Sequence, residues 1–283
     1  MALRSHPTAR QVRLGTELRR LREAAGMTAR DTAALLGVNA AQMTHIESGL
    51  SGVSAVRLRR LASHYACTDE ALVDALVAMA TSRTRGWWDA YRGVLPQVFQ
   101  DLAELEHHAT FLREVVVTHV PGLFQTADYA RAVYSYVNPG MPASELEPRV
   151  EHRMQRRTVI EGDSPTPYEA IVHEFALRIR VSDRRVAHAQ LRQILDLTEH
   201  NRVGVRIIPV DQDHFAGAGV SMMYVGGPVP KLDTGLRDAP INKGPIDAEA
   251  QLQRLRALLV KVEKAALSPT QSRDFIHRLS KEL

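Results

Sequence analysis

The segment from residue 27 to residue 49, MTARDTAALLGVNAAQMTHIESG, constrains the fold of this chain more than any other, because it predicts two short helices joined at one glycine. Thr28, with Asp31 three residues later, is typical of a helix N-terminus. Gly37 predicts the end of that helix, since glycine is common just beyond a helix C-terminus. Asn39 is a good N-terminal cap for a second helix that fills the rest of the segment. Helices joined by so short a turn must cross each other.

The apolar side chains of this segment fall where a crossed helix pair needs them. Ala33 is small where the two helices approach, and Leu36 and Val38 flank the turn. Met43 and Ile46 provide the inward face of the second helix. The other side chains of that helix are therefore expected to point outward; they are Ala40, Ala41, Gln42, Thr44 and His45.

Positive charge is concentrated at the N-terminal end of the chain. Ten arginines and four acidic residues between Met1 and Tyr65 give this part a formal charge of +6, whereas the whole chain carries +4. The remainder is therefore slightly acidic. A basic domain joined to a near-neutral body is typical of a protein that binds a polyanion, although a solvated arginine-rich surface gives the same pattern.

Residues 14–49 resemble the helix-turn-helix of the Cro/repressor-like (XRE) family, through LGTELRRLREAAGMT (14–28) and the segment described above. The resemblance implies double-stranded DNA as the partner. The second helix would enter the major groove, which is wide enough for one α-helix, while its neighbour fixes its angle. The resemblance also implies an internal ion pair between Arg22 and Glu47.

The expected DNA contacts follow from this arrangement. Gln42 is suited to pair with adenine through two hydrogen bonds. The helix N-termini at Thr28 and Asn39 offer N–H groups to phosphate oxygens, and nearby arginines offer charge. The full set is Thr28, Arg30, Asn39, Ala40, Ala41, Gln42, Thr44, His45, Arg13, Arg57 and Arg59.

The sequence departs from the XRE pattern at several positions. Ala29 stands where the family usually has a DNA-contacting Gln, and Thr32 replaces a core Leu. Leu35 occupies a position that is commonly polar, and the loop after Gly49 lacks the usual Arg and Pro. Fewer polar contacts imply weaker DNA binding than in a typical member, or binding that depends on a partner.

We expect two domains. Residues 1–80 should form the all-α helix-turn-helix domain, and the apolar-free stretch TSRTRG (81–86) a linker. Residues 87–283 should form an α+β domain with a small, mainly antiparallel sheet. The expected strands are 114–120, 168–173 and 203–209, with a hairpin from 221–225 and 231–234.

The second domain also resembles a known family. VPGLFQTADYARAVY (120–134), HRMQRR (152–157), IVHEFALR (171–178) and VGVRIIPVDQDHFAG (203–217) resemble the WhiJ-like, DUF5753-type domain, of unassigned function, that follows such helix-turn-helix modules. This resemblance implies a regulator, some of whose relatives are antitoxin-like and act with a small partner protein. The basic helix at 149–157 is expected to be a solvated face rather than a second nucleic-acid site.

Two places in the second domain are candidates for ligand binding. Gln125 and Tyr129 follow a strand-to-helix corner and would either line the rim of a pocket or simply build the corner. His214 and Phe215 lie in a glycine-rich loop that would be either a lid or an ordinary loop.

Other function classes find little support. Cys67 is the only cysteine, so neither an internal disulfide nor a cysteine-based zinc site is expected. No long apolar run, P-loop, HExxH or GxSxG pattern occurs, and the N-terminus is polar. We therefore expect a cytoplasmic, non-enzymatic DNA-binding transcriptional regulator without cofactor or metal. It would act as a homodimer, modulated by a small effector or partner. The alternative is an antitoxin-like interaction module with a vestigial helix-turn-helix.

Overall fold

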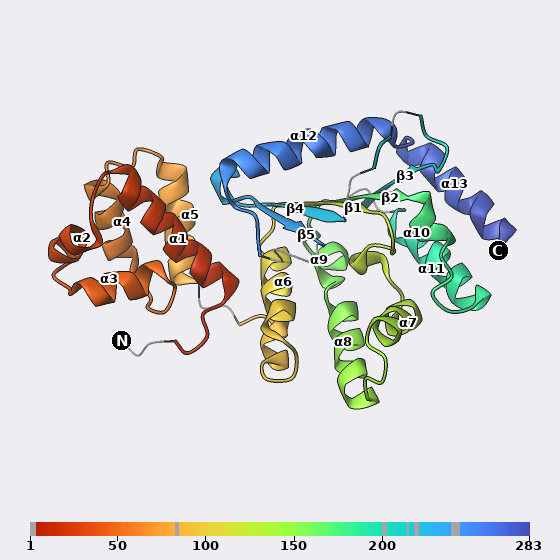
Figure 1. Ribbon diagram of the computed structural model, residues 1–283, viewed down its shortest axis with the longest axis horizontal. Helices are drawn as coiled ribbons and strands as arrows, with labels where there is room; N and C mark the ends of the chain where they lie inside the picture. The colour runs from red at the N-terminus through yellow and green to blue at the C-terminus, as the bar shows by residue number, and fades with distance from the viewer. Residues whose placement is uncertain (1–3, 83–84, 200–202, 214, 218–220, 239–243) are drawn as a thin grey trace. The chain divides into compact units, whose positions relative to one another are not determined.

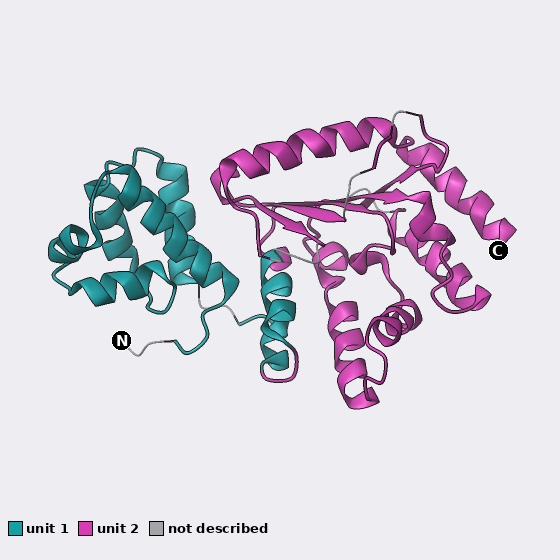
Figure 2. Cartoon of the chain, in the orientation of Figure 1, with its two compact units in different colours: residues 1–92, 96–105 teal, residues 93–95, 106–283 magenta. Residues whose placement is uncertain are grey.

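The computed structural model describes residues 4–82, 85–199, 203–213, 215–217, 221–238 and 244–283 (Figure 1). The chain divides into two compact units (Figure 2). Unit 1 consists of residues 1–92 and 96–105, and unit 2 of residues 93–95 and 106–283. Each unit buries its own set of apolar side chains.

The described part of unit 1 is helical, as expected for the N-terminal domain. Leu18 of the first helix, Met43 of the third and Leu61 of the fourth are fully buried. The helices are α1 (Ala9–Ala24), α2 (Ala29–Leu36), α3 (Ala40–Glu47), α4 (Ala55–His64), α5 (Glu70–Thr81), the 3-10 helix η1 (Trp87–Tyr91) and most of α6 (Gln97–His107).

Both ends of α2 and the start of α3 have the caps that the sequence predicts. Thr28 accepts the N–H of Asp31 at 3.1 Å, and Asp31 accepts the N–H of Thr28 at 3.2 Å, which completes a capping box. Gly37 ends α2 with a φ of +66°, in the left-handed region that glycine adopts without strain. The Asn39 side chain caps α3 by accepting the N–H of Gln42 at 2.8 Å.

Helices α1 and α3 approach each other closely at Gly15. A Cβ atom at this position would lie 2.4 Å from the carbonyl oxygen of Glu47, which is far inside van der Waals contact. The crossing of α1 over α3 therefore depends on a residue without a side chain. This contact fixes one end of α3 against the body of unit 1.

Unit 2 is an α+β domain built on a five-stranded sheet of order β3-β2-β1-β4-β5. The strands are β1 (Phe111–Val116), β2 (Tyr168–His173), β3 (Val203–Ile208), β4 (Met222–Gly226) and β5 (Thr234–Arg237). β1, β2 and β3 run parallel, while β4 is antiparallel to both β1 and β5. The expected α+β class is confirmed, but the expectation of a mainly antiparallel sheet is wrong, because the sheet is mixed.

The long helical connections explain the parallel half of the sheet. Parallel neighbours need a crossover of a dozen residues or more, usually helical, whereas a tight hairpin joins only antiparallel strands. The connection from β1 to β2 carries η2 (Gly122–Phe124), α7 (Ala127–Val137), α8 (Ala143–Gln155) and α9 (Thr158–Glu161), and that from β2 to β3 carries α10 (Glu174–Arg178) and α11 (Arg184–Leu197).

The expected strands are found with different accuracy. β2 spans the predicted residues 168–173, and β3 lies within 203–209. β1 lies earlier than the predicted 114–120, since the chain leaves the sheet before the corner at Pro121. The second hairpin strand, predicted at 231–234, begins only at Thr234, because η3 (Pro230–Leu232) occupies the residues before it.

Helices cover both faces of the sheet (Figure 1). α12 (Glu249–Ala265) lies along one face, where Leu255 and Leu259 pack with Ile171 of β2. α13 (Pro269–Glu282) packs beside β3. On the face opposite α12, the ring of Phe124 meets that of Tyr168 edge to face, with 5.2 Å between centroids.

Candidate nucleic-acid interface

Helix α3 presents one buried and one exposed face. Met43 and Ile46 are buried in the core of unit 1. Gln42 and His45 are partly exposed. The exposed positions are Asn39, Ala40, Ala41 and Thr44. Unit 1 therefore leaves uncovered the surface that the sequence assigned to base contacts.

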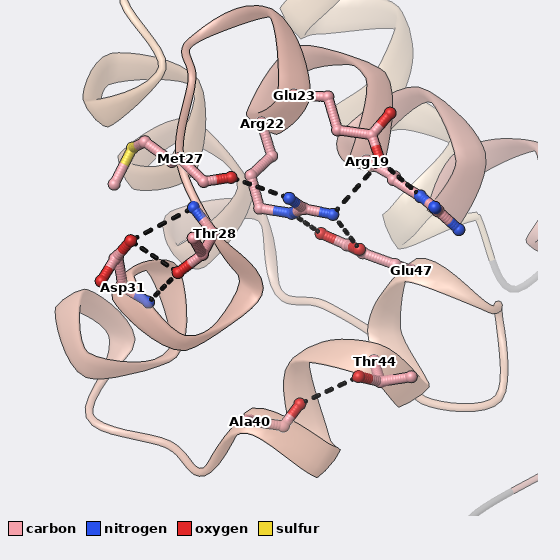
Figure 3. A network of polar contacts seen from close by, with 9 residues as sticks. All are labelled: Arg19, Arg22, Glu23, Met27, Thr28, Asp31, Ala40, Thr44 and Glu47. Atoms are coloured by element: carbon pink, nitrogen blue, oxygen red, sulfur yellow. Dashed lines mark hydrogen bonds and ion pairs between the residues drawn. The ribbon is translucent and has the colours of Figure 1, made fainter.

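An ion pair between α1 and α3 holds this helix in place (Figure 3). Arg22 donates to both carboxylate oxygens of Glu47, at 2.6 and 2.9 Å, and to the carbonyl of Met27 at 2.8 Å. The hydrogen bond to Glu47 raises the pKa of Arg22 above its usual value. The expected internal pair is confirmed, and it also ties down the turn that precedes α2.

The N-terminus of α2 is already occupied by a carboxylate. Asp31 accepts both the N–H and the hydroxyl of Thr28, the latter at 2.5 Å (Figure 3). These hydrogen bonds hold the pKa of Asp31 below its usual value. A DNA phosphate at Thr28 would have to replace this carboxylate or share its donors.

The four arginines expected at phosphates differ in whether they already bind a carboxylate of the protein. Arg13 donates to Glu17 at 2.7 Å, and Arg59 donates to Asp74 at 2.7 Å. Arg30 and Arg57 are exposed and form no ion pair with any described residue. Two of the four guanidinium groups are therefore ready to meet a phosphate without first breaking an internal contact.

One departure from the XRE pattern has a clear structural consequence. Thr32, in place of a core Leu, is fully buried. Its hydroxyl lies near that of Tyr65, but the two oxygens do not reach the geometry of a hydrogen bond with each other or with another described residue. Burial raises the pKa of the Tyr65 hydroxyl. A Leu at position 32 would replace one of these two buried polar atoms, the Thr32 hydroxyl, with apolar contact.

Comparison with known families gives two matches along the chain. A family model described as "Helix-turn-helix domain" matches residues 13–76, and one described as "Domain of unknown function (DUF5753)" matches residues 99–278. The chain belongs to the DUF5753 family. The comparison with curated proteins finds no match, and neither does the comparison with solved structures.

Within the DUF5753 domain, the two residues predicted at the corner after β1 are both buried. The Tyr129 hydroxyl accepts the N–H of Val120 at 3.1 Å, and Gln125 donates to the carbonyl of the same residue at 2.8 Å. Burial raises the pKa of Tyr129. Tyr129 therefore builds the corner, while the Oε1 atom of Gln125 is directed to a basic side chain, Arg153.

The predicted loop residues do not join this corner within the described structure. Phe215 stacks on His173, with 5.8 Å between the ring centroids. His214 lies outside the described residues. Among the described residues, no three His, Cys, Asp or Glu side chains could hold a metal ion, and no helix has the length and hydropathy to span a bilayer.

The basic segment 149–157 differs from the expected solvated face of the DUF5753 domain. Arg156 is buried and donates to both oxygens of Glu106, at 2.8 and 2.5 Å. Arg153, three residues earlier, is only partly exposed. Sequence periodicity gives no signal for this burial, because the carboxylate that permits it lies 50 residues away.

Proposed function

We propose that this chain is a sequence-specific DNA-binding transcriptional regulator. The exposed face of α3, from Asn39 to His45, carries the proposal, because unit 1 supports the helix from behind and leaves that face uncovered. A major groove of B-DNA accepts one such helix, whose first turn meets the base edges. The match to a helix-turn-helix family over residues 13–76 supports the same partner.

The contact residues divide into two classes. Gln42 carries an amide that pairs with adenine through two hydrogen bonds, so it contributes sequence preference. Arg30 and Arg57, exposed and without an internal carboxylate, contribute affinity for phosphates regardless of sequence. Arg13 and Arg59 contribute less, because each must first leave its carboxylate.

The active form in this proposal is a homodimer. Two copies of α3 would enter successive major grooves, so the operator would have half-sites about 34 Å apart, or a multiple of that spacing. The DUF5753 domain modulates binding by taking up a small ligand or a small partner protein that favours one population of the dimer.

Selection of bound duplexes from a random pool by the full chain, followed by fluorescence anisotropy, tests this proposal. Gln42→Ala is expected to lose about 1–3 kcal/mol of discrimination at one base position. Arg57→Ala is expected to weaken binding to all sequences alike and to reduce the salt slope by about one.

Arg192→Ala provides the matched control. The Arg192 side chain lies on α11 of unit 2 and is 84% exposed, so its removal deletes one charge without touching unit 1. This variant is expected to bind like the wild type. The absence of any duplex binding at low salt would reject the proposal, and an unchanged base preference in Gln42→Ala would remove Gln42 from the recognition surface.

A second candidate function is a protein-interaction module, similar to an antitoxin, with a weak helix-turn-helix. The internal carboxylates favour it, since Asp31, Glu17 and Asp74 occupy groups that would otherwise meet phosphates. Asp31→Asn separates the two functions. In a DNA-binding protein it removes a negative charge beside the groove and tightens duplex binding. In an interaction module it leaves duplex binding absent while partner capture persists.

A further inference from the structure

The strongest unexplained feature of unit 2 is Arg153 on α8. Its Nη1 atom donates to Oε1 of Gln125 at 2.7 Å, and its Nη2 atom donates to the hydroxyl of Tyr134 at 2.6 Å. Its guanidinium carbon lies 4.8 Å from the centre of the Tyr134 ring. All of these partners are neutral. Arg153 therefore gains hydrogen bonds from these groups but no ion pair, and the carboxylate that acts on its charge, Glu106, does so without a direct contact.

The neighbouring arginines on the same segment are paired differently. Arg149 lies 3.7 Å from the Glu145 carboxylate, and Arg156 binds Glu106 through two hydrogen bonds. None of the ion pairs among the described residues includes Arg153, and its Nε atom is buried without a hydrogen-bond partner. A guanidinium that is largely removed from water without a paired carboxylate is stabilised by an added anion, so this position favours one.

The other carboxylate nearby does not neutralise Arg153. Glu114 on β1 accepts the hydroxyl of Tyr168 at 2.5 Å. Burial raises the pKa of Glu114, which favours its neutral form. With Glu106 already bound to Arg156, the cluster keeps an excess of positive charge at Arg153.

The place of this charge in the fold also suits a ligand. A Cβ atom on Gly122 would lie 3.4 Å from Nη1 of Arg153, so the guanidinium sits beside the corner where the chain leaves β1. β1 is parallel to β2, and α/β sheets bind ligands outside the carboxyl ends of parallel strands. Arg153 and Tyr134 are both partly exposed, which leaves them accessible from solvent.

We propose that Arg153 and Tyr134 bind the oxyanion of a small molecule, a carboxylate or a phosphate, at the carboxyl end of β1. Arg153 provides the charge and N–H donors. Tyr134 accepts one N–H of Arg153 and keeps its own hydroxyl proton for the ligand. Gln125 is a positioning residue, held by the carbonyl of Val120. The proposal names the ligand class for the ligand-dependent part of the proposed function, on which it rests, and is independent of DNA binding.

Calorimetric unfolding of the full chain tests the site with two probes, inorganic phosphate and acetate, each compared with chloride at equal ionic strength and pH. Both tryptophans lie in unit 1, so tryptophan fluorescence identifies the unit 1 transition and the remaining transition reports unit 2. We expect at least one probe to raise the unfolding temperature of unit 2 in a saturable manner, since a ligand stabilises the state it binds.

Arg153→Gln is the decisive variant. It is expected to weaken the probe's apparent affinity by roughly tenfold or more, because a charge-assisted hydrogen-bonded contact is lost. Arg149→Gln, on the same helix, removes the same charge and should keep the wild-type response. Tyr134→Phe should weaken binding severalfold, whereas Tyr136→Phe, at an 85% exposed position of the same helix, should not.

The outcomes separate a built site from a general salt effect. Phosphate stabilises many proteins without saturation, and such an effect would appear equally in all variants. The proposal is overturned if neither probe gives a saturable shift of unit 2, or if Arg153→Gln responds like the wild type. Duplex binding, measured separately on the same preparations, shows whether the helix-turn-helix works regardless of this result.

Discussion

The side chains of Arg22 in unit 1 and Arg153 in unit 2 lie largely within the protein but form hydrogen bonds to different kinds of partner. Arg22 meets the carboxylate of Glu47 through two hydrogen bonds, whereas Arg153 meets only neutral groups. A guanidinium bound by both oxygens of a carboxylate has its charge balanced within the protein. One without a carboxylate carries a cost that an external anion would offset. The first explains how α3 is held, and the second indicates where unit 2 would bind a ligand.

Arg156 makes the comparison possible within a single segment. It lies three residues after Arg153, yet it is bound by Glu106 in the same bidentate manner as Arg22 is by Glu47. Arg156 therefore differs from Arg153 in having a carboxylate partner, and not only in being more deeply buried. Removing the Glu106 carboxylate should leave Arg156, like Arg153, without a carboxylate partner.

Glu106→Gln is expected to have the largest effect. It leaves two neighbouring guanidinium groups without a carboxylate, so unit 2 should lose about 3–5 kcal/mol of unfolding free energy. Hydrogen-exchange mass spectrometry of β1 and β2 peptides measures this loss.

The control for this variant is Glu145→Gln, whose carboxylate lies at a position on α8 that is 59% exposed. It should change the stability by less than about 0.5 kcal/mol. A similarly small loss in Glu106→Gln would mean that Arg156 is compensated by other means, and the contrast with Arg153 would fail.

Glu47→Gln breaks the corresponding pair in unit 1. We expect a loss of about 2–3 kcal/mol, smaller than in unit 2, because Arg22 keeps the carbonyl of Met27. Urea unfolding followed by tryptophan fluorescence measures it. Glu23→Gln, at a 52% exposed position, is the control and should cost less than about 0.5 kcal/mol. An equal loss in both variants would show that the Arg22 pair adds nothing beyond a surface contact.

How far the sequence predicts each unit depends on the range of the contacts involved. In unit 1 the decisive signals are local, because Thr28, Gly37 and Asn39 end or begin helices through neighbours within three residues. The Arg22–Glu47 pair spans 25 residues, and only the family resemblance predicted it. The exposed face of α3 follows from local periodicity, and the i,i+4 spacing of Arg13 and Glu17 on α1 is a local signal too. Asp74, the partner of Arg59, lies 15 residues away and leaves no such signal.

Unit 2 depends on contacts that no local pattern specifies. The apolar run Tyr168–His173 predicts a strand, yet nothing in it says that its neighbours run parallel. Arg153 and Arg156 look like solvent-facing residues, because their polar partners are distant in sequence. The corner pattern leaves open whether Gln125 lines a pocket rim or builds the corner, and only the structure shows it buried with its Oε1 atom accepting an N–H from Arg153.

Thr32→Val should give the smallest change in unfolding free energy. The sign of this change tests whether a neutral buried group differs from the charged Arg153. The buried Thr32 hydroxyl lacks a hydrogen bond, as the Arg153 Nε atom does, but it is neutral. An unsatisfied neutral group costs about 1 kcal/mol or more, so we expect Thr32→Val to stabilise unit 1 by about 1 kcal/mol in urea unfolding. Thr32→Ser keeps the hydroxyl, loses a buried methyl group and should destabilise. If Thr32→Val also destabilises, the hydroxyl is bonded to Tyr65, and charge is no longer what distinguishes Arg153 from other buried polar groups.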